Sequence, residues 1–409
     1  MREIEIHEKL RHLTMLQIES LMNKYYNGVK ASDIIKEYNI DTTSSKLYTL
    51  FPPIICEDII CPVCNEPMYK ERDSKSSYSW NKKKPFCAIC GHTDEIICKC
   101  NYCIAEREKV RKLNEERKVR ILQEKREKIK KVYDLNIVPV NYSELNFREK
   151  VFLGALLRTS LSEDMEVILP LNDAERELAP TIGYIKEILS YLIGRGVVSV
   201  DSNSSIDAFL DSNEEKDIEF PNVYYITMVK YRINIVGDED IKNILSKIIN
   251  PKSFSDADKE DALNIWKEIA LEECIEYFEY QMKSVRFDFN IGEKTIAIFK
   301  DLLENFSVSQ IYGIIYKSVA NATKYYQESS VSKKQAANSV IGGCQRYAER
   351  AMINNWELAK YSRIKELPQS MISEFFFDRV IGVGSLGFNM PPSCLLYTSP
   401  SPRDRSLSR

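Results

Sequence analysis

The stretch KLYTLFPPIICEDIICPVC, residues 46–64, places a helix stop directly before a pair of cysteines. Pro52 and Pro53 end a helix because proline has no backbone N–H to donate. Cys61 and Cys64 form the first of two Cys-x-x-Cys motifs, and the second follows a polar loop that contains Lys82, Lys83 and Lys84. This spacing is typical of a zinc ribbon, in which the metal stabilises a module too small to bury a large core. We therefore expect a ribbon over residues 56–104 with one structural Zn²⁺ held by Cys61, Cys64, Cys87 and Cys90.

A second group of cysteines, Cys98, Cys100 and Cys103, follows closely. Cys56 or His92 would complete a second zinc site with them. The alternative leaves them as free thiols on the last strand of the ribbon, and both interpretations stay open. The N-terminus carries acidic residues where a secretory signal would be basic and apolar, so we expect a reducing, cytoplasmic setting that favours metal ligands over disulfides.

The residues before the double proline have the pattern of three short helices, over 10–27, 32–38 and 44–50, with Ser32 as a helix cap. Three helices with short turns are typical of a helix-turn-helix, whose last helix enters the DNA major groove. We expect such a module over residues 1–55. A three-helix protein-docking module would show the same pattern.

The segment GVKASDIIKEYNIDTTSSKLYTLFP, residues 28–52, resembles the DNA-binding module of the invertase and resolvase recombinases. The shared features are a glycine, a short helix, an Ile-centred turn and a Ser-Thr-Leu-Tyr-Arg-Tyr-Phe-Pro-like ending. The segment departs at Lys46 and Thr49, where the family has Thr and Arg, and no recombinase catalytic domain is visible. The resemblance implies a DNA-reading fold, without recombinase chemistry, whose exposed contact residues are Thr43, Ser44, Ser45, Lys46 and Tyr48.

Charge is distributed unevenly along the chain. Residues 1–133 contain 26 Lys and Arg against 20 Asp and Glu, a net charge of +6, whereas the remaining residues have a net charge of −9. Residues 105–132 alone carry twelve basic and six acidic side chains without Gly or Pro. This composition predicts an exposed basic spacer helix over 105–133, which could also self-associate as a short coiled coil or lie along phosphates.

The C-terminal part predicts a mixed region over 146–250 and a helical bundle over 256–392. Residues 181–201 read as a helix, a Gly-Arg-Gly turn and a strand, an order found in winged-helix domains. The overall fold class is therefore α+β and predominantly α. Two of the predicted bundle helices carry a basic and aromatic mixture, for which core packing of the tyrosines is the simpler explanation: Lys324, Tyr325, Tyr326, Arg346, Tyr347 and Arg350.

The end of the chain, CLLYTSPSPRD from Cys394 to Asp404, matches the translation of a transposase-type sequencing adapter. We interpret residues 394–409 as an assembly artefact and expect the native reading frame to be interrupted near Ser393. Elsewhere the sequence has no apolar run of the roughly 18 residues that a membrane span needs, so no membrane partner is expected. No histidine follows His92, which removes the commonest general base from the C-terminal region and argues against an enzyme.

These observations predict a zinc-stabilised protein that binds duplex DNA, such as a bacterial or phage-related regulator or mobile-element factor, with a helical effector or assembly region. One alternative is a scaffold whose N-terminal modules contact proteins in a larger complex. Another is a DNA-processing enzyme that lacks its C-terminal part.

Overall fold

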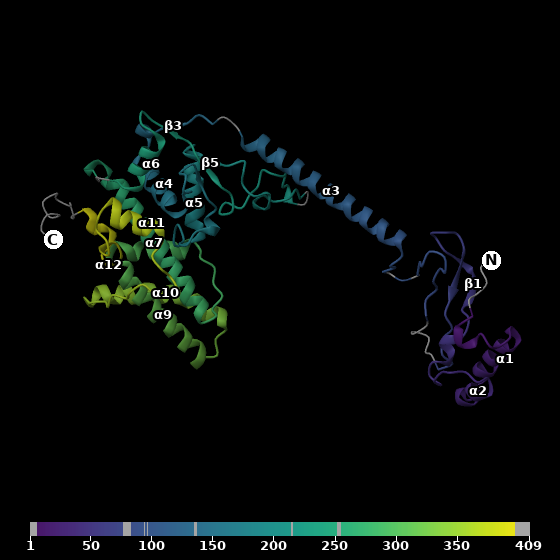
Figure 1. Cartoon of the computed structure of the whole chain (residues 1–409). Coiled ribbons are helices and arrows are strands. Elements are labelled where there is room, and N and C mark those ends of the chain that lie inside the picture. The colour runs from purple at the N-terminus through teal and green to yellow at the C-terminus, as the bar shows by residue number, and fades with distance from the viewer. Residues whose placement is uncertain are drawn as a thin grey trace, which may run out of the picture. The chain divides into compact units, whose positions relative to one another are not determined.

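The computed structural model describes residues 6–76, 83–93, 95, 97–134, 137–213, 216–251 and 255–396. It forms two compact units, Met1–Ile121 and Leu122–Arg409 (Figure 1). Helices dominate and the sheets are small, which confirms a mainly α fold of the α+β class. Within the described residues, no helix combines the length and the apolar character that crossing a membrane requires.

The first unit begins with a small helical layer made of η1 (Glu8–Leu10), α1 (Met15–Tyr26) and α2 (Ala31–Glu37). A capping box starts α1, in which Thr14 and Gln17 satisfy each other's backbone N–H groups. The layer packs around a small apolar core of buried side chains from η1, α1, α2 and residues 47–51: Leu10, Ile18, Leu21, Ile34, Leu47 and Phe51.

The predicted third helix over 44–50 is wrong. Residues 44–46 form a turn, and only the 3₁₀ helix η2 (Leu47–Leu50) follows. Its backbone bonds span three residues, as in Thr49 N–H to the Lys46 carbonyl at 3.1 Å. Ser32 is also not a cap, because α2 begins at Ala31 and the capping position is Lys30. The DNA-reading helix expected from the sequence is thus reduced to an exposed turn.

A two-stranded antiparallel sheet follows the double proline. Its strands β1 (Ile54–Ile60) and β2 (Pro67–Lys70) pair Ile54 with Lys70 and Cys56 with Met68, and an irregularity interrupts the register before Ile60. Phe86 then bridges to Tyr69 of β2 and to Thr93. β1 therefore lies at the edge of this sheet.

The spacer helix is present and is longer than predicted. α3 (Asn101–Tyr133) has 33 residues, or about 50 Å at 1.5 Å per residue. All side chains over residues 104–124 are exposed, whereas Ile129 near its end is buried in the core of the second unit. A solvated helix of this kind is supported by side-chain pairs of opposite charge, for example Arg111 and Glu115.

The first half of the second unit combines helices with two small sheets. Helices α4 (Phe147–Ser160), α5 (Ile182–Gly194) and α6 (Ile241–Ile249) pack beside an antiparallel sheet of β4 (Val167–Ile168), β6 (Tyr231–Ile233) and β5 (Val198–Val200), in that order. β3 (Val140–Asn141) pairs in parallel with β7 (Ile235–Val236). The expected order of helix, glycine turn and strand is present, with Gly196 at a φ of 71° between α5 and β5.

The rest of the second unit is helical. It contains α7 (Lys259–Ser284), α8 (Glu293–Asn305), α9 (Val308–Glu328), α10 (Lys333–Ile353), α11 (Met371–Glu374), a π-helical segment (Phe375–Val380), α12 (Leu386–Asn389) and η10 (Pro392–Leu396). One continuous core includes residues from both predicted regions, such as Phe152 and Phe278. Of the tail interpreted as an artefact, residues 397–409 lie outside the described residues.

Candidate metal centres

The two Cys-x-x-Cys motifs form matched knuckles. In the first, the Cys61 N–H donates to the Glu66 carbonyl at 2.8 Å and the Asn65 N–H returns to the Cys61 carbonyl at 2.9 Å. In the second, the Cys87 N–H donates to the His92 carbonyl and the Gly91 N–H returns to the Cys87 carbonyl. In both knuckles, the residue four positions after the first cysteine adopts the left-handed backbone conformation with positive φ.

Asn65 and Gly91 occupy these left-handed positions, with φ of 57° and 68°. Glycine adopts this conformation without strain, and asparagine is among the residues that tolerate it best. The sequence therefore supplies the right residue at the same point of each knuckle, so that each turn aims two sulfurs in one direction.

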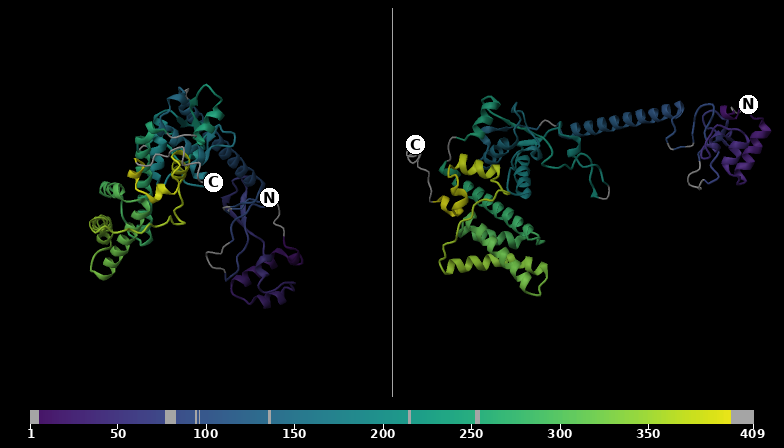
Figure 2. Two further views of the ribbon diagram at one scale, coloured as in Figure 1. Left: turned by 90° about the vertical axis from the view of Figure 1, so that its left-hand side faces the viewer. Right: turned by 60° about the horizontal axis from the view of Figure 1, so that its bottom comes forward.

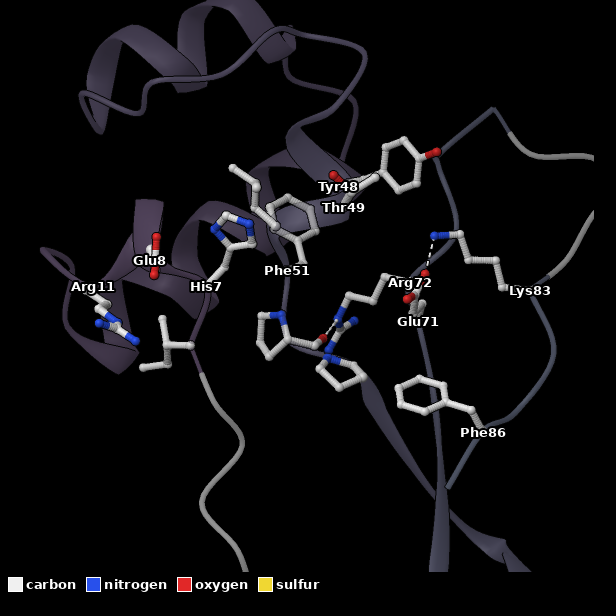
Figure 3. Close-up of a pocket in the computed structure, with 14 residues that line it drawn as sticks. His7, Glu8, Arg11, Tyr48, Thr49, Phe51, Glu71, Arg72, Lys83 and Phe86 are labelled. Carbon is white, nitrogen blue, oxygen red and sulfur yellow. Dashed lines mark hydrogen bonds and ion pairs between the residues drawn. The ribbon is translucent and has the colours of Figure 1, made fainter. Parts of the chain in front are cut away.

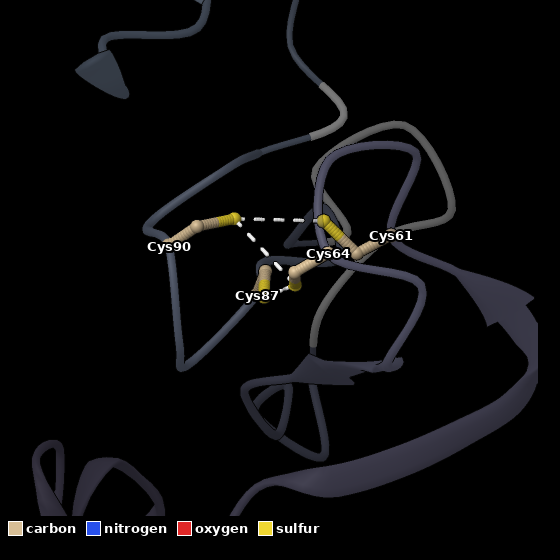
Figure 4. Close-up of side chains that lie close together, drawn as sticks. All are labelled: Cys61, Cys64, Cys87 and Cys90. Carbon is tan, nitrogen blue, oxygen red and sulfur yellow. Dashed lines mark hydrogen bonds between the residues drawn. The ribbon is translucent and has the colours of Figure 1, made fainter. Parts of the chain in front are cut away.

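The knuckles bring four sulfurs together (Figure 4). Cys61 Sγ lies 3.5 Å from Cys90 Sγ, and Cys64 Sγ lies 3.3 Å from Cys87 Sγ. All four ligand atoms lie within 4.8 Å of one another. A tetrahedral ion with metal–sulfur bonds of about 2.3 Å would separate its ligands by about 3.8 Å. The group formed by Cys61, Cys64, Cys87 and Cys90, hereafter the ribbon group, could therefore hold a metal ion.

Crowding of thiols changes their acidity. Contact with the Cys87 thiol, together with burial, raises the pKa of Cys64 to about 12. Burial also opposes ionisation of Cys87, but N–H donors from Cys90 and Ile89 and the neighbouring thiols outweigh it and lower its pKa to about 7. The ribbon group thus favours a thiolate at Cys87, and a cation is the natural means of keeping the remaining sulfurs ionised together.

A second group gathers His92, Cys98, Cys100 and Cys103, whose ligand atoms also lie within 4.8 Å of one another. The His92 Nδ1 atom lies 3.5, 3.7 and 3.2 Å from the sulfurs of Cys98, Cys100 and Cys103. We call this set the helix group. Cys56 and His92 were the two candidates for the fourth ligand. In the structure, His92 lies beside the three sulfurs, with its Nδ1 atom facing them.

The helix group sits at the start of α3. Cys100 precedes the first residue of the helix, and its sulfur accepts the N–H of Cys103 at 3.4 Å, as a capping side chain does. Arg107 on the next turn donates to the Cys98 carbonyl at 2.5 Å. N–H groups of Cys100 and Thr93 lower the pKa of Cys98 to about 6. The helix group therefore presents an ionised sulfur and closes the N-terminus of a long helix.

The other cysteines are not part of either group. Cys56 is half-buried on β1 opposite Met68, outside both sets of ligand atoms. Cys274 and Cys344 are buried in the core of the second unit, where burial raises the pKa of both thiols, as expected for core cysteines.

No family model, curated protein or solved structure matches the chain. Any functional conclusion therefore depends on the residues themselves.

The predicted DNA-contact residues fall on an exposed turn and beside it. Thr43, Ser44, Ser45 and Lys46 are all exposed, and Thr43 and Ser45 share a hydroxyl hydrogen bond of 3.2 Å. Tyr48 is half-buried. Of the loop lysines, Lys83 is half-buried, Lys84 is exposed and Lys82 lies outside the described residues.

A pocket lies between residues 48–53, which follow this turn, and the ribbon residues Glu71, Arg72, Lys83 and Phe86 (Figure 3). The Lys83 Nζ lies 5.6 Å from the centre of the Tyr48 ring and also pairs with Glu71. Arg72 donates to the carbonyl of Pro52 at 2.9 Å. The pocket has a volume of about 460 Å³ and is also lined by His7 and Arg11.

Sequence reasoning missed Arg72, His7 and Arg11 as neighbours of this surface. Their approach depends on the packing of η1 and β2 against the double proline, which no local spacing reports. Charge does not single them out either, since residues 1–100 carry 14 basic and 14 acidic side chains.

Proposed function

We propose that the ribbon group and the helix group each hold a structural Zn²⁺. Four sulfurs, or three sulfurs and one imidazole nitrogen, are the donors that tetrahedral zinc prefers. Each set supplies four protein ligands, which leaves no open position for a substrate or an activated water. In the described part of the chain, the apolar core beside the ribbon group consists of Met68, Cys61 and Cys87 with Val63 packed against them, so the metals would contribute much of the stability of this module.

We further propose that the first unit binds duplex DNA. The contact between Tyr48 and Lys83 is the observation that carries this proposal, because it brings η2, which directly follows the exposed turn, next to the lysine loop. Lys46 on the turn makes no side-chain hydrogen bond or ion pair within the described part of the chain. A free cation beside hydroxyl and tyrosine side chains offers contacts for both base edges and phosphates.

The attraction for a polyanion comes mainly from α3. Residues 1–100 contain 14 basic and 14 acidic side chains, so the whole excess of positive charge in the first third of the chain lies on this helix. Its exposed stretch over residues 104–124 leaves these cations accessible. Phosphate contacts along α3 would supply affinity without sequence preference, while the turn at Thr43–Lys46 would supply what preference exists.

The experiment that tests this function is a binding titration of the zinc-loaded full chain against a random-sequence duplex pool at low salt. We expect binding whose affinity falls steeply as salt is raised, since bound phosphates release counterions. A folded, zinc-loaded chain that does not bind the pool at low salt would rule out the proposal.

A protein scaffold is the second candidate function, and the ribbon gives it a specific basis. The edge strand β1 exposes four isoleucines, each with 40 to 50% of its residue surface accessible: Ile54, Ile55, Ile59 and Ile60. An exposed apolar edge strand is a template for pairing with another protein. Replacement of Ile55 and Ile59 by Thr would leave DNA binding unchanged under the first proposal and would abolish partner capture under the second.

A further inference from the structure

A groove runs between α9 and α10 in the second unit. The two helices are joined by a four-residue connection over 329–332 and lie side by side (Figures 1 and 2). The groove has a volume of about 440 Å³. Its residues on α9 are Ser318, Asn321, Ala322 and Tyr325, spaced at three and four residues, so they form one stripe along the helix.

Small side chains form the floor of this groove. Ser318 and Ala322 of α9 are buried, and Ser339 and Gly343 of α10 face them. A Cβ atom added at Gly343 would approach the Ser318 Cβ at 3.5 Å, so the absence of a side chain there deepens the floor. The two helices therefore pack closely along the floor of the groove, and the space between its walls stays open.

Aromatic and basic side chains form the walls. Tyr325 of α9 is exposed at one side, and Arg346, Tyr347 and Arg350 of α10 lie on the other. Tyr347 accepts a hydrogen bond of 2.8 Å from Lys317, and its ring lies 5.8 Å from the exposed ring of Trp356. The tyrosine wall is thus held in place by a lysine and a tryptophan from neighbouring segments.

The two arginines are not used by the fold. Within the described residues, neither the Arg346 nor the Arg350 guanidinium has a carboxylate partner or a side-chain hydrogen bond, and no acidic residue lines the groove. Residues 308–353 carry six Lys and Arg against two Asp and Glu, although residues 134–409 together have a net charge of −9. A local excess of unpaired cations in an acidic region indicates an anionic ligand.

We propose that this groove binds single-stranded nucleic acid, with phosphates on Arg346 and Arg350 and a base stacked on Tyr325 or Tyr347. Planar guanidinium groups match phosphate oxygens, and exposed aromatic rings accept any base on their faces. Tyr325, Arg346 and Arg350 are exposed on the walls, which suits a strand that passes through the groove. The groove is independent of the metal groups and of the turn at Thr43–Lys46, so its function stands or fails separately from duplex binding.

The test uses the zinc-loaded full chain and a fluorescein-labelled oligo(dT) of twenty nucleotides. Arg346→Ala/Arg350→Ala should weaken binding by about tenfold or more, because phosphate contacts are lost. The matched control is Lys333→Ala/Lys334→Ala, which removes the same charge from the start of α10 outside the groove. This control should change the affinity less than about twofold. Equal losses in the two double variants, or no loss in either, would overturn the proposal.

Trp356 provides a local signal for the same test. Binding of oligo(dT) should quench tryptophan fluorescence in the wild type and in Trp80→Phe but not in Trp356→Phe, because the Trp356 ring lies against Tyr347 of the groove wall. Quenching that persists in Arg346→Ala/Arg350→Ala would count against the groove. Competition by inorganic phosphate or by AMP at concentrations as low as those of the oligonucleotide would show a small-ligand site and overturn the assignment to a strand.

Discussion

The backbone N–H of Cys87 donates to the carbonyl oxygen of His92 at 2.7 Å, and these two residues belong to different metal groups. The bond closes the second knuckle of the ribbon group. It also fixes the backbone from which the His92 ring reaches the three sulfurs of the helix group. An ion bound to the ribbon group would therefore help to place a ligand of the helix group, and we expect the two sites to fill cooperatively.

The first prediction concerns metal stoichiometry. The chain purified from zinc-containing medium should hold two zinc ions, because each group supplies four ligands. Cys98→Ser should leave one ion, whereas Cys56→Ser should keep both because Cys56 lies outside both groups. Elemental analysis against protein concentration checks this, and a Cys98→Ser variant with two ions would contradict the helix group.

The second prediction concerns removal of metal. A strong chelator should unfold the ribbon and leave the second unit intact, since structural zinc contributes about 10 to 16 kcal/mol of apparent binding energy in small modules. Hydrogen exchange should show lost protection in β1 and β2 and unchanged protection in α7 and α9. Ribbon amides that stay protected after complete metal removal would show that the small apolar core is sufficient.

The third prediction separates two kinds of DNA contact. Lys46→Ala should reduce discrimination among duplex sequences by about 1 to 3 kcal/mol, as expected for a lost base contact. Lys83→Ala/Lys84→Ala should weaken all sequences alike and lower the salt slope by up to about 2. Selection from a random pool measures the first effect and salt titration the second; identical behaviour of the two variants would remove the distinction.

The fourth prediction concerns a buried ion pair in the second unit. Glu273 is buried, and its Oε1 atom forms an ion pair with Arg363 at 2.8 Å and accepts a hydrogen bond from Ser373 at 2.7 Å. Arg363→Met should lower the free energy of unfolding by about 3 kcal/mol, because it leaves a buried charge without its partner. Lys267→Ala, which breaks an exposed pair with Glu304, should cost less than about 1 kcal/mol in the same denaturant titration.

The double variant Glu273→Leu/Arg363→Met extends this comparison. It should recover most of the lost stability, since neither charge then remains in the core. A double variant that is as unstable as Arg363→Met would show that packing, and not the orphaned carboxylate, sets the cost.

The fifth prediction concerns pH. Burial, reinforced by the charge of Glu273, raises the pKa of Glu276 to about 8 against the opposing effect of Arg363, and Glu177 and Glu279 add to the rise. A raised pKa means that the folded state holds the proton more tightly than the unfolded state does. The stabilisation is complete below the usual pKa of 4.5 and is lost as the pH rises to about 8.

Glu276→Gln, which mimics the protonated side chain, should therefore remove this part of the pH dependence. Denaturant titrations of both proteins at several pH values between about 5 and 8.5 measure the difference. Wild type and variant should have similar stability at the acid end, and the variant should be the more stable at the alkaline end. If the stabilities of wild type and variant changed with pH in the same way, the raised pKa of Glu276 would be contradicted.

The ribbon group was predictable because its information is local. Two cysteines three positions apart, followed by Asn65 or Gly91 in the left-handed position, define a knuckle wherever it occurs. The choice between Cys56 and His92 was not predictable from spacing. It depends on the backbone hydrogen bond between Cys87 and His92, which places the His92 ring beside Cys98, Cys100 and Cys103.

The prediction of a third helix was wrong for a physical reason that can be seen in the sequence. Thr43, Ser44 and Ser45 carry hydroxyls that form local hydrogen bonds in competition with the backbone bonds of a helix. The hydrogen bond between the Thr43 and Ser45 hydroxyls is an example. The Thr49 hydroxyl likewise bonds the Lys46 carbonyl at 2.8 Å. With the double proline immediately after, too few residues remain to form a helix with four-residue bonds. The pocket near Arg72 was beyond prediction because its lining comes from segments spread over the chain between Ile6 and Phe86.

The sulfur cap at Cys100 has a consequence for how α3 forms. A polar helix with an exposed middle gains little from packing, and its first turn is the costly step because several residues must be fixed for one hydrogen bond. Metal binding at the helix group would fix that turn in advance, and burial of Ile129 fixes the last turns from the opposite end. Nucleation is thereby supplied at both termini, so loss of the ion should fray α3 progressively from Asn101 while its final turns stay helical.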